Sequence, residues 1–154
     1  MVNRIYVEKL TNYDPATAKL KADISNVLGM NVTYLRRLLR YDVEGIDGEA
    51  LEKAKISIFS EPTVDLVYEE IKELEDKQLI IVEYLDGQYD QRADSAAQCV
   101  QLLTAGVRPL VRCATVYAFE GLNEEQLQKV KKYLINNTIS CIYLNCFHFW
   151  LQYR

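Results

Sequence analysis

Histidine, tryptophan, proline and glycine are all scarce in this chain of 154 residues. It has one histidine, one tryptophan, three prolines and six glycines. The glycines are dispersed along the chain, so none of them forms the glycine-rich loop that cradles a phosphate. The only histidine is His148, and no Ser-His-Asp triad can be built with confidence around a cleft. The sequence therefore predicts no catalytic residues.

Long apolar runs and an excess of positive charge are also missing. No run of 18 apolar residues occurs, so we expect no membrane span. The N-terminal segment MVNRIYVEKL has neither the apolar core nor the cleavage site of a signal peptide. The net charge is -4, whereas a broad nucleic-acid footprint needs a basic face. We therefore expect a cytoplasmic protein that binds neither nucleic acid nor membranes.

The four cysteines form no CxxC pair, which argues against a zinc site or a redox motif. Cys141, Cys146 and His148 have the spacing C-x4-C-x-H, which lacks a fourth ligand. In a cytoplasmic protein such cysteines are typically reduced and structural. The sequence therefore predicts no metal site.

An internal repeat is present, with an offset of 76 residues. Residues 41–59 match residues 117–135 at seven of 19 positions, and Tyr13-Asp14 matches Tyr89-Asp90. Background composition gives about one identity over such a length. We interpret the chain as a duplication, with copies at about 3–70 and 79–147 and a charged connector at 71–78 (IKELEDKQ).

Each copy shows the same predicted order, strand-helix-strand-helix-strand. The first copy has strands at 4–9, 32–44 and 64–69 and helices at 14–28 and 48–59; the second has strands at 79–84, 111–120 and 139–147 and helices at 90–103 and 123–135. Asp14 and Asp90 are the expected N-caps, and Gly29 and Gly106 stand at the expected helix ends. The apolar faces of the first helix in each copy are expected to be Leu20, Ile24, Val27 and Leu28, and Ala96, Cys99, Val100 and Leu103.

The expected fold class is α+β, with two tandem ferredoxin-like units in one domain spanning 1–154. A unit of this kind has one sheet face covered by helices and one bare face. We expect the two bare faces to pack together with pseudo-twofold symmetry, which leaves the helices on the outer faces.

The turn entering the second copy's first helix is the most unusual stretch. It is dense in polar residues: Gln88, Tyr89, Asp90, Gln91, Arg92, Asp94 and Ser95. Asp90 and Asp94 suit the helix dipole, whereas helix energetics does not explain Arg92. A docking contact to another surface and a plain capped helix start remain open as two interpretations.

Arg36 and Arg112 occupy equivalent positions in the repeat. Arginine binds phosphate through two parallel hydrogen bonds, which makes this pair a candidate phosphate contact. Pairing with nearby glutamates on a solvated or interface-facing strand is the interpretation that the sequence favours.

Several segments resemble the N-terminal domain of single-chain phosphoribosylformylglycinamidine synthases (formylglycinamide ribonucleotide amidotransferases). They are 4–9 (RIYVEK), 40–45 (RYDVEG), 58–62 (IFSEP), 64–70 (VDLVYEE), 83–99 (EYLDGQYDQRADSAAQC) and 131–136 (KKYLIN). The resemblance covers 3 to about 136, and residues 87–99 are its most specific part. The family's domain is similar to a fused dimer of the small PurS-type subunit, which agrees with the duplication.

The resemblance implies a non-catalytic scaffold in purine biosynthesis. In the family this PurS-like domain packs against an ATP-dependent synthetase core and helps to join it to a glutaminase domain. ATP and magnesium belong to domains that this sequence does not contain, so the chain alone is expected to hold no cofactor and to have no ligase activity. The synthetase and glutaminase parts are its expected partners, and docking is expected through residues 87–95 and the tyrosine-bearing faces.

After Asn136 the sequence departs from the family. Residues 137–154 are apolar, aromatic and cysteine-bearing, which is unlike a linker and resembles a truncated or frameshifted end. We expect residues 139–147 to supply the second copy's final strand, or else to be disordered, and self-association through this tail stays open. A free-standing ferredoxin-like dimer that binds a ligand or has a regulatory role is the alternative function.

Overall fold

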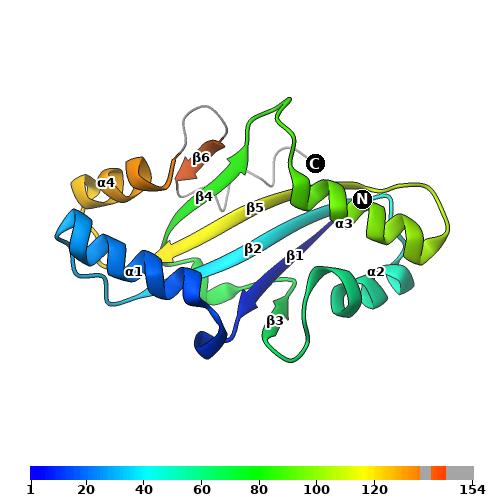
Figure 1. Cartoon of the computed structure of the whole chain (residues 1–154), viewed down its shortest axis with the longest axis horizontal. Helices are drawn as coiled ribbons and strands as arrows, with labels where there is room; N and C mark the ends of the chain where they lie inside the picture. The colour runs from blue at the N-terminus through cyan, green and yellow to red at the C-terminus, as the bar shows by residue number, and fades with distance from the viewer. Residues whose placement is uncertain (136–139, 145–154) are drawn as a thin grey trace.

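The computed structural model describes the backbone of residues 1–135 and 140–144 and the side chains of residues 1–135 (Figure 1). The described strands are β1 (Val2–Lys9), β2 (Leu35–Glu44), β3 (Asp65–Tyr68), β4 (Gln78–Tyr84), β5 (Leu110–Phe119) and β6 (Ser140–Leu144). The described α-helices are α1 (Pro15–Leu28), α2 (Gly48–Ala54), α3 (Gln91–Thr104) and α4 (Glu124–Leu134). Three short helical segments lie between them: the 3-10 helices η1 (Thr11–Tyr13) and η3 (Lys72–Leu74) and the π-helix η2 (Lys55–Phe59). The fold class is α+β, as the sequence predicts.

All six strands form one antiparallel sheet in the order β3-β1-β2-β5-β4-β6. The central pair is β2 with β5, in a ten-residue register that runs from Leu35 opposite Phe119 to Glu44 opposite Leu110. The expectation that the two copies pack bare face to bare face is therefore wrong. The two halves of the chain join edge to edge, because the backbone groups along β2 and β5 hydrogen-bond to each other.

The four described α-helices cover the same face of this sheet. One apolar cluster joins Tyr41 and Val43 of β2 to α2 and α3, and a second joins Phe119 of β5 and Ile80 of β4 to α1 and α4. Side chains alternate across a strand, and the odd-numbered residues of β2 and β5 contribute to both clusters. The helices therefore lie on one face in two pairs, α1 with α4 and α2 with α3 (Figure 1).

The opposite face is covered at its centre by the connector between the copies. Ile71 and Leu74, which are 2% and 1% exposed, pack against Leu38, Val116 and Ile81. The sequence predicts a charged connector for residues 71–78, and the structure adds that its two apolar side chains are buried. Because no described α-helix covers the sheet's second face, these two side chains exclude water from its centre.

The ends of the long helices follow local capping rules with one exception. Asp14 accepts a hydrogen bond from the Thr17 amide, and Asp90 accepts from the amides of Arg92 and Ala93. Gly29 ends α1 in the left-handed conformation, as expected. At the end of α3 that position is Ala105, not Gly106.

The buried faces of α1 and α3 differ in part from the expected ones. Val27 is 66% exposed, and in α3 both Cys99 and Leu103 are exposed. The core of α3 is built from alanines and one valine, namely Ala93, Ala96, Ala97 and Val100. The residues of α3 that face the core are therefore small, whereas Cys99 and Leu103 face solvent.

Two of the expected elements match the structure in part. The helix expected over 48–59 changes from α to π geometry at Lys55. β6 occupies part of the expected final strand and pairs with β4, as β3 pairs with β1. The rest of the 137–154 tail, including Cys146 and His148, lies outside the described residues. No helix in the described part of the chain is long and apolar enough to cross a membrane.

Candidate functional site

The polar turn before α3 is held in place by its own backbone. Gly87 has a φ of 85°, a conformation in which a side chain would be strained. The Gln88 amide donates to the Leu85 carbonyl at 2.9 Å, and Asp90 then caps α3. This geometry fixes the direction in which Tyr89 leaves the turn.

Asp94 is the centre of a small hydrogen-bonded network. Its carboxylate accepts from the Tyr89 hydroxyl at 3.1 Å and from the Gln98 amide at 3.1 Å, and it forms an ion pair with Arg108. Arg108 also donates to the Asp94 carbonyl at 3.0 Å. The network joins the turn, α3 and the segment before β5, so Asp94 organises the site and has little capacity left for a partner.

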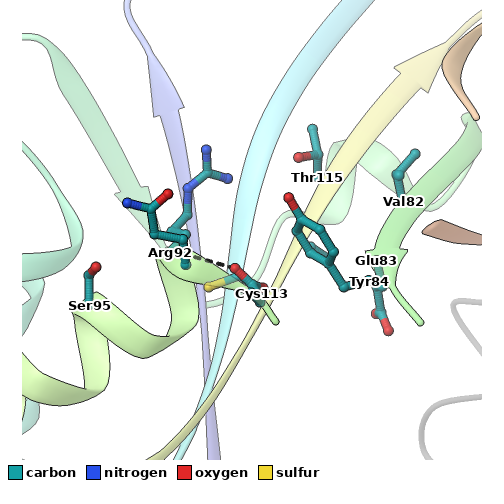
Figure 2. A pocket seen from close by; sticks show the side chains of 10 residues that line it. Val82, Glu83, Tyr84, Arg92, Ser95, Cys113 and Thr115 are labelled. Carbon is teal, nitrogen blue, oxygen red and sulfur yellow. Dashed lines mark hydrogen bonds between the residues drawn. The ribbon is translucent and has the colours of Figure 1, made fainter. Parts of the chain in front are cut away.

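A cavity of about 510 Å³ opens between α3 and the neighbouring strands. Arg92 and Ser95 come from the first two turns of α3, Cys113 and Thr115 from β5, and Tyr84 from β4. Figure 2 shows the Tyr84 hydroxyl and Thr115 facing Arg92 across the open space, with the Cys113 sulfur beneath. The cavity lies on the helix-bearing face of the sheet, because Cys113 and Thr115 are odd-numbered residues of β5.

Most polar side chains around this cavity are not engaged elsewhere. Within the part of the chain that the structure describes, no hydrogen bond or ion pair is made by the side chains of Tyr84, Gln91, Arg92, Ser95 or Thr115. The two carboxylates of the lining differ from them. Glu83 pairs with Arg40, whereas Asp90 uses Oδ1 to cap α3 and leaves Oδ2 without a hydrogen-bond donor among the described residues.

Cys113 contributes a neutral thiol to the cavity floor. Burial raises the pKa of Cys113 to about 12, and the nearby Asp90 carboxylate acts in the same direction. Burial also raises the pKa of the adjacent Tyr41 hydroxyl to about 12. Near pH 7 the thiol therefore stays protonated, and it is a poor nucleophile and a poor metal ligand.

A shallower groove of about 360 Å³ lies beside the polar turn. Its lining includes Tyr84, Tyr89 and Leu110, which are 47%, 68% and 56% exposed. Arg108 and Arg112 line it as well. Exposed aromatic and aliphatic side chains next to arginine are typical of a surface that binds another protein.

The structure divides the residues of the predicted docking turn between these two hollows. Gln91, Arg92 and Ser95 line the cavity, Gln88, Tyr89 and Asp94 line the groove, and Asp90 lines both. Sequence reasoning found the turn but missed Thr115, Cys113 and Tyr84. No local pattern marks these three, since they come together only when β4 and β5 pair.

The two candidate phosphate contacts lie far apart. Arg36 is opposite Ala118 near one end of the β2–β5 pair, and Arg112 is opposite Asp42 near the other. Arg36 forms a two-point ion pair with Glu8 at 2.8 and 2.6 Å, and these hydrogen bonds hold the pKa of Arg36 above its usual range. This agrees with glutamate pairing for Arg36, the alternative that the sequence favours.

Sequence reasoning also missed a buried charge cluster on the connector side of the sheet. Arg40, only 3% exposed, pairs with Glu83 and lies 3.2 Å from Asp42, and Asp42 binds Arg4 at 2.6 Å. The available signal was strand alternation, which places Arg40 and Asp42 on one face of β2.

Comparison with known proteins adds no assignment. Among the described residues, no three histidine, cysteine or acidic side chains gather as metal ligands. No family model matches the chain. No curated protein matches it in sequence.

Proposed function

We propose that the chain is a PurS-like domain of two tandem ferredoxin-like units related by pseudo-twofold symmetry. One observation carries the proposal: Leu39 of β2 lies directly opposite Thr115 of β5. These two residues are 76 apart, which is the offset of the sequence repeat. On a twofold axis between two copies, a residue must pair with its own counterpart, so the register supports the duplication.

The strand order supports the same proposal. Counting outward from the centre, the first copy contributes β2, β1 and β3, and the second contributes β5, β4 and β6. The helix contacts across the copies are equivalent as well: the first helix of one copy packs against the second helix of the other, α1 with α4 and α3 with α2. A fused dimer of one ancestral unit would have this arrangement.

The proposed role is that of a non-catalytic docking domain of a phosphoribosylformylglycinamidine synthase. The domain would bind the synthetase core and help to join it to the glutaminase part, whose reactions need the ATP and magnesium sites of those other domains. The exposed groove at Tyr84, Tyr89 and Leu110 supports docking at this end of the molecule. Tyr89 is the best single anchor, because its hydrogen bond to Asp94 fixes it before a partner arrives.

Binding to the rest of a family enzyme tests this role. The ligand is the synthetase and glutaminase portion of such an enzyme expressed without its own N-terminal domain, titrated calorimetrically with the chain. Tyr89→Ala should weaken association by at least about tenfold, as for an aromatic anchor at an interface.

The repeat offers a matched control. Tyr13 is the counterpart of Tyr89 and is 55% exposed, but it lies in η1 at the other end of the sheet. Tyr13→Ala should change the association constant less than twofold. An unaltered association for Tyr89→Ala, with circular dichroism showing an intact fold, would remove the turn from the interface. No association of the wild-type chain would remove the proposed role.

The alternative function, a free-standing ligand-binding or regulatory protein, is supported by a different observation. The cavity beside Arg92 contains polar groups that the fold itself does not use. Saturable stabilisation of the chain by a small molecule, without any partner protein, distinguishes this alternative from docking.

A further inference from the structure

We propose that the cavity between α3, β4 and β5 binds a small zwitterion, an α-amino acid, between Arg92 and Asp90. The inference does not depend on the docking role. It begins from two opposite charges in one cavity that do not pair with each other. Both residues line it, yet no ion pair joins them within the described residues.

The charges select the ligand class. Arg92 is the one cation among the described residues of the lining, and its two parallel N–H groups match a carboxylate. On the other side, Oδ2 of Asp90 is left over after Oδ1 has capped α3, and it can accept from an ammonium group. A simple anion would meet the Asp90 charge unopposed, and a simple cation would meet Arg92. A ligand with both groups on adjacent atoms satisfies the two residues together.

The remaining walls define where the ligand's side chain lies. Ser95, Thr115 and Tyr84 supply three hydroxyl groups, and Val82 supplies an apolar surface. The Cys113 thiol adds no charge. At about 510 Å³ the cavity has the size of a small-molecule site and has room for an amino acid of any size. This lining favours a small or medium side chain that is uncharged.

Thermal unfolding of the full chain gives the first test. The probes are L-alanine, L-serine, L-valine, L-glutamine and L-methionine, each at up to 10 mM and constant ionic strength. For each amino acid that stabilises the chain, the matched carboxylic acid without the amino group is measured in parallel, such as propionate for L-alanine. We expect a saturable rise in Tm, roughly 5 °C when the ligand is a hundredfold above its Kd, for at least one amino acid and not for its deaminated analogue.

Two variants then locate the site. Arg92→Gln removes the cation and should weaken binding by at least about tenfold. Asp90→Asn keeps a helix cap of similar strength but removes the charge that faces the ammonium, and it should weaken binding by a similar factor. Arg112→Gln is the control, because Arg112 is also exposed and directly precedes Cys113 but is not among the described residues that line the cavity.

Several outcomes would overturn the inference. One is that no amino acid in the panel stabilises the wild-type chain. Another is that propionate and its relatives bind as well as the amino acids, which would make the cavity an anion site. Equal losses for Arg92→Gln and Arg112→Gln would also overturn it. The comparison of amino acid with deaminated analogue uses only the wild-type chain, so it decides the question even where a variant fails to fold.

Discussion

Ala105 and Gly29 hold the same backbone conformation at the ends of α3 and α1. Their φ angles are 48° and 65°. A β-carbon in the left-handed region costs roughly 1 kcal/mol, and glycine does not have this cost. The second copy therefore carries local strain that the first copy lacks.

Replacing Ala105 by glycine should stabilise the protein. We expect Ala105→Gly to raise the free energy of unfolding by about 0.5 kcal/mol, since glycine's greater freedom in the unfolded chain offsets part of the gain. Gly29→Ala, the matched reverse change, should lower it by about 1 kcal/mol. Urea denaturation measures both changes. A midpoint for Ala105→Gly below that of the wild-type chain would show that the backbone at Ala105 is not strained.

Cys113 and Tyr41 make stability sensitive to alkaline pH. Their pKa values rise from ordinary values of 9.0 and 10.0 to about 12 each, because burial disfavours the charged forms. The folded chain therefore keeps these protons where the unfolded chain loses them. Their contribution is complete below pH 9 and falls as the pH rises toward 12.

The thiol's share of this loss can be measured separately. Between pH 9 and 10.5, Cys113 should lower the free energy of unfolding by about 1–2 kcal/mol. Cys113→Ala should flatten the decline by that amount in urea titrations under reducing conditions. Cys99→Ala, which changes an exposed thiol on α3, should leave the decline as it is. If the free energy of unfolding falls equally with pH in wild type and in Cys113→Ala, the raised pKa of the buried thiol does not contribute to stability.

At the scale of elements, η3 is a short segment that closes one face of the sheet. Leu74 is 1% exposed and packs among Leu38, Leu79 and Val116, whereas Lys72 in the same turn is exposed. Leu74→Ala should lower the free energy of unfolding by about 2–5 kcal/mol, as for other buried leucines. Lys72→Ala should stay within about 0.5 kcal/mol. Similar midpoints for the two variants in denaturant titrations would show that η3 does not seal this face.

Elements with their own local signals could be predicted from the sequence. Asp14 and Asp90 mark the starts of α1 and α3, and the β-branched stretches mark β1 and β4. The buried face of α3 could not, because an alanine such as Ala93 fits the core or the surface equally well.

Features that depend on pairing of distant segments were also beyond the sequence. The sequence repeat indicates two copies, but no local sequence pattern predicts whether they pack through sheet faces or through strand edges. The β2–β5 pairing, which the structure shows, settles this. The cavity could not be predicted either, because Tyr84, Arg92 and Thr115 lie in different segments and no local pattern marks any of them as part of a site. The polar turn at residues 87–95 could be singled out from the sequence because a high density of polar residues is a local feature.

At the scale of the whole molecule, each copy leaves one long strand edge for the other. An isolated chain of residues 1–76 would expose all ten residues of β2 along that edge. We expect it to dimerise through β2 with Leu39 opposite Leu39, a register that also places Arg36 opposite Asp42. Sedimentation should detect the dimer, and adding residues 77–154 should replace it by a heterodimer. A folded monomer of residues 1–76 would contradict the expected pairing.

The β2–β5 pairing has a consequence for the protein's synthesis on the ribosome. Glu44, the last residue of β2, pairs with Leu110, which is made 66 residues later. At typical bacterial-to-eukaryotic elongation rates of about 5–20 residues per second, the nascent first copy waits roughly 3–13 seconds before its partner strand is even translated. During that interval β2 is an open template for a neighbouring nascent chain on the same messenger. Chaperone binding to the emerging chain should therefore be greatest between the completion of β2 and the appearance of β5.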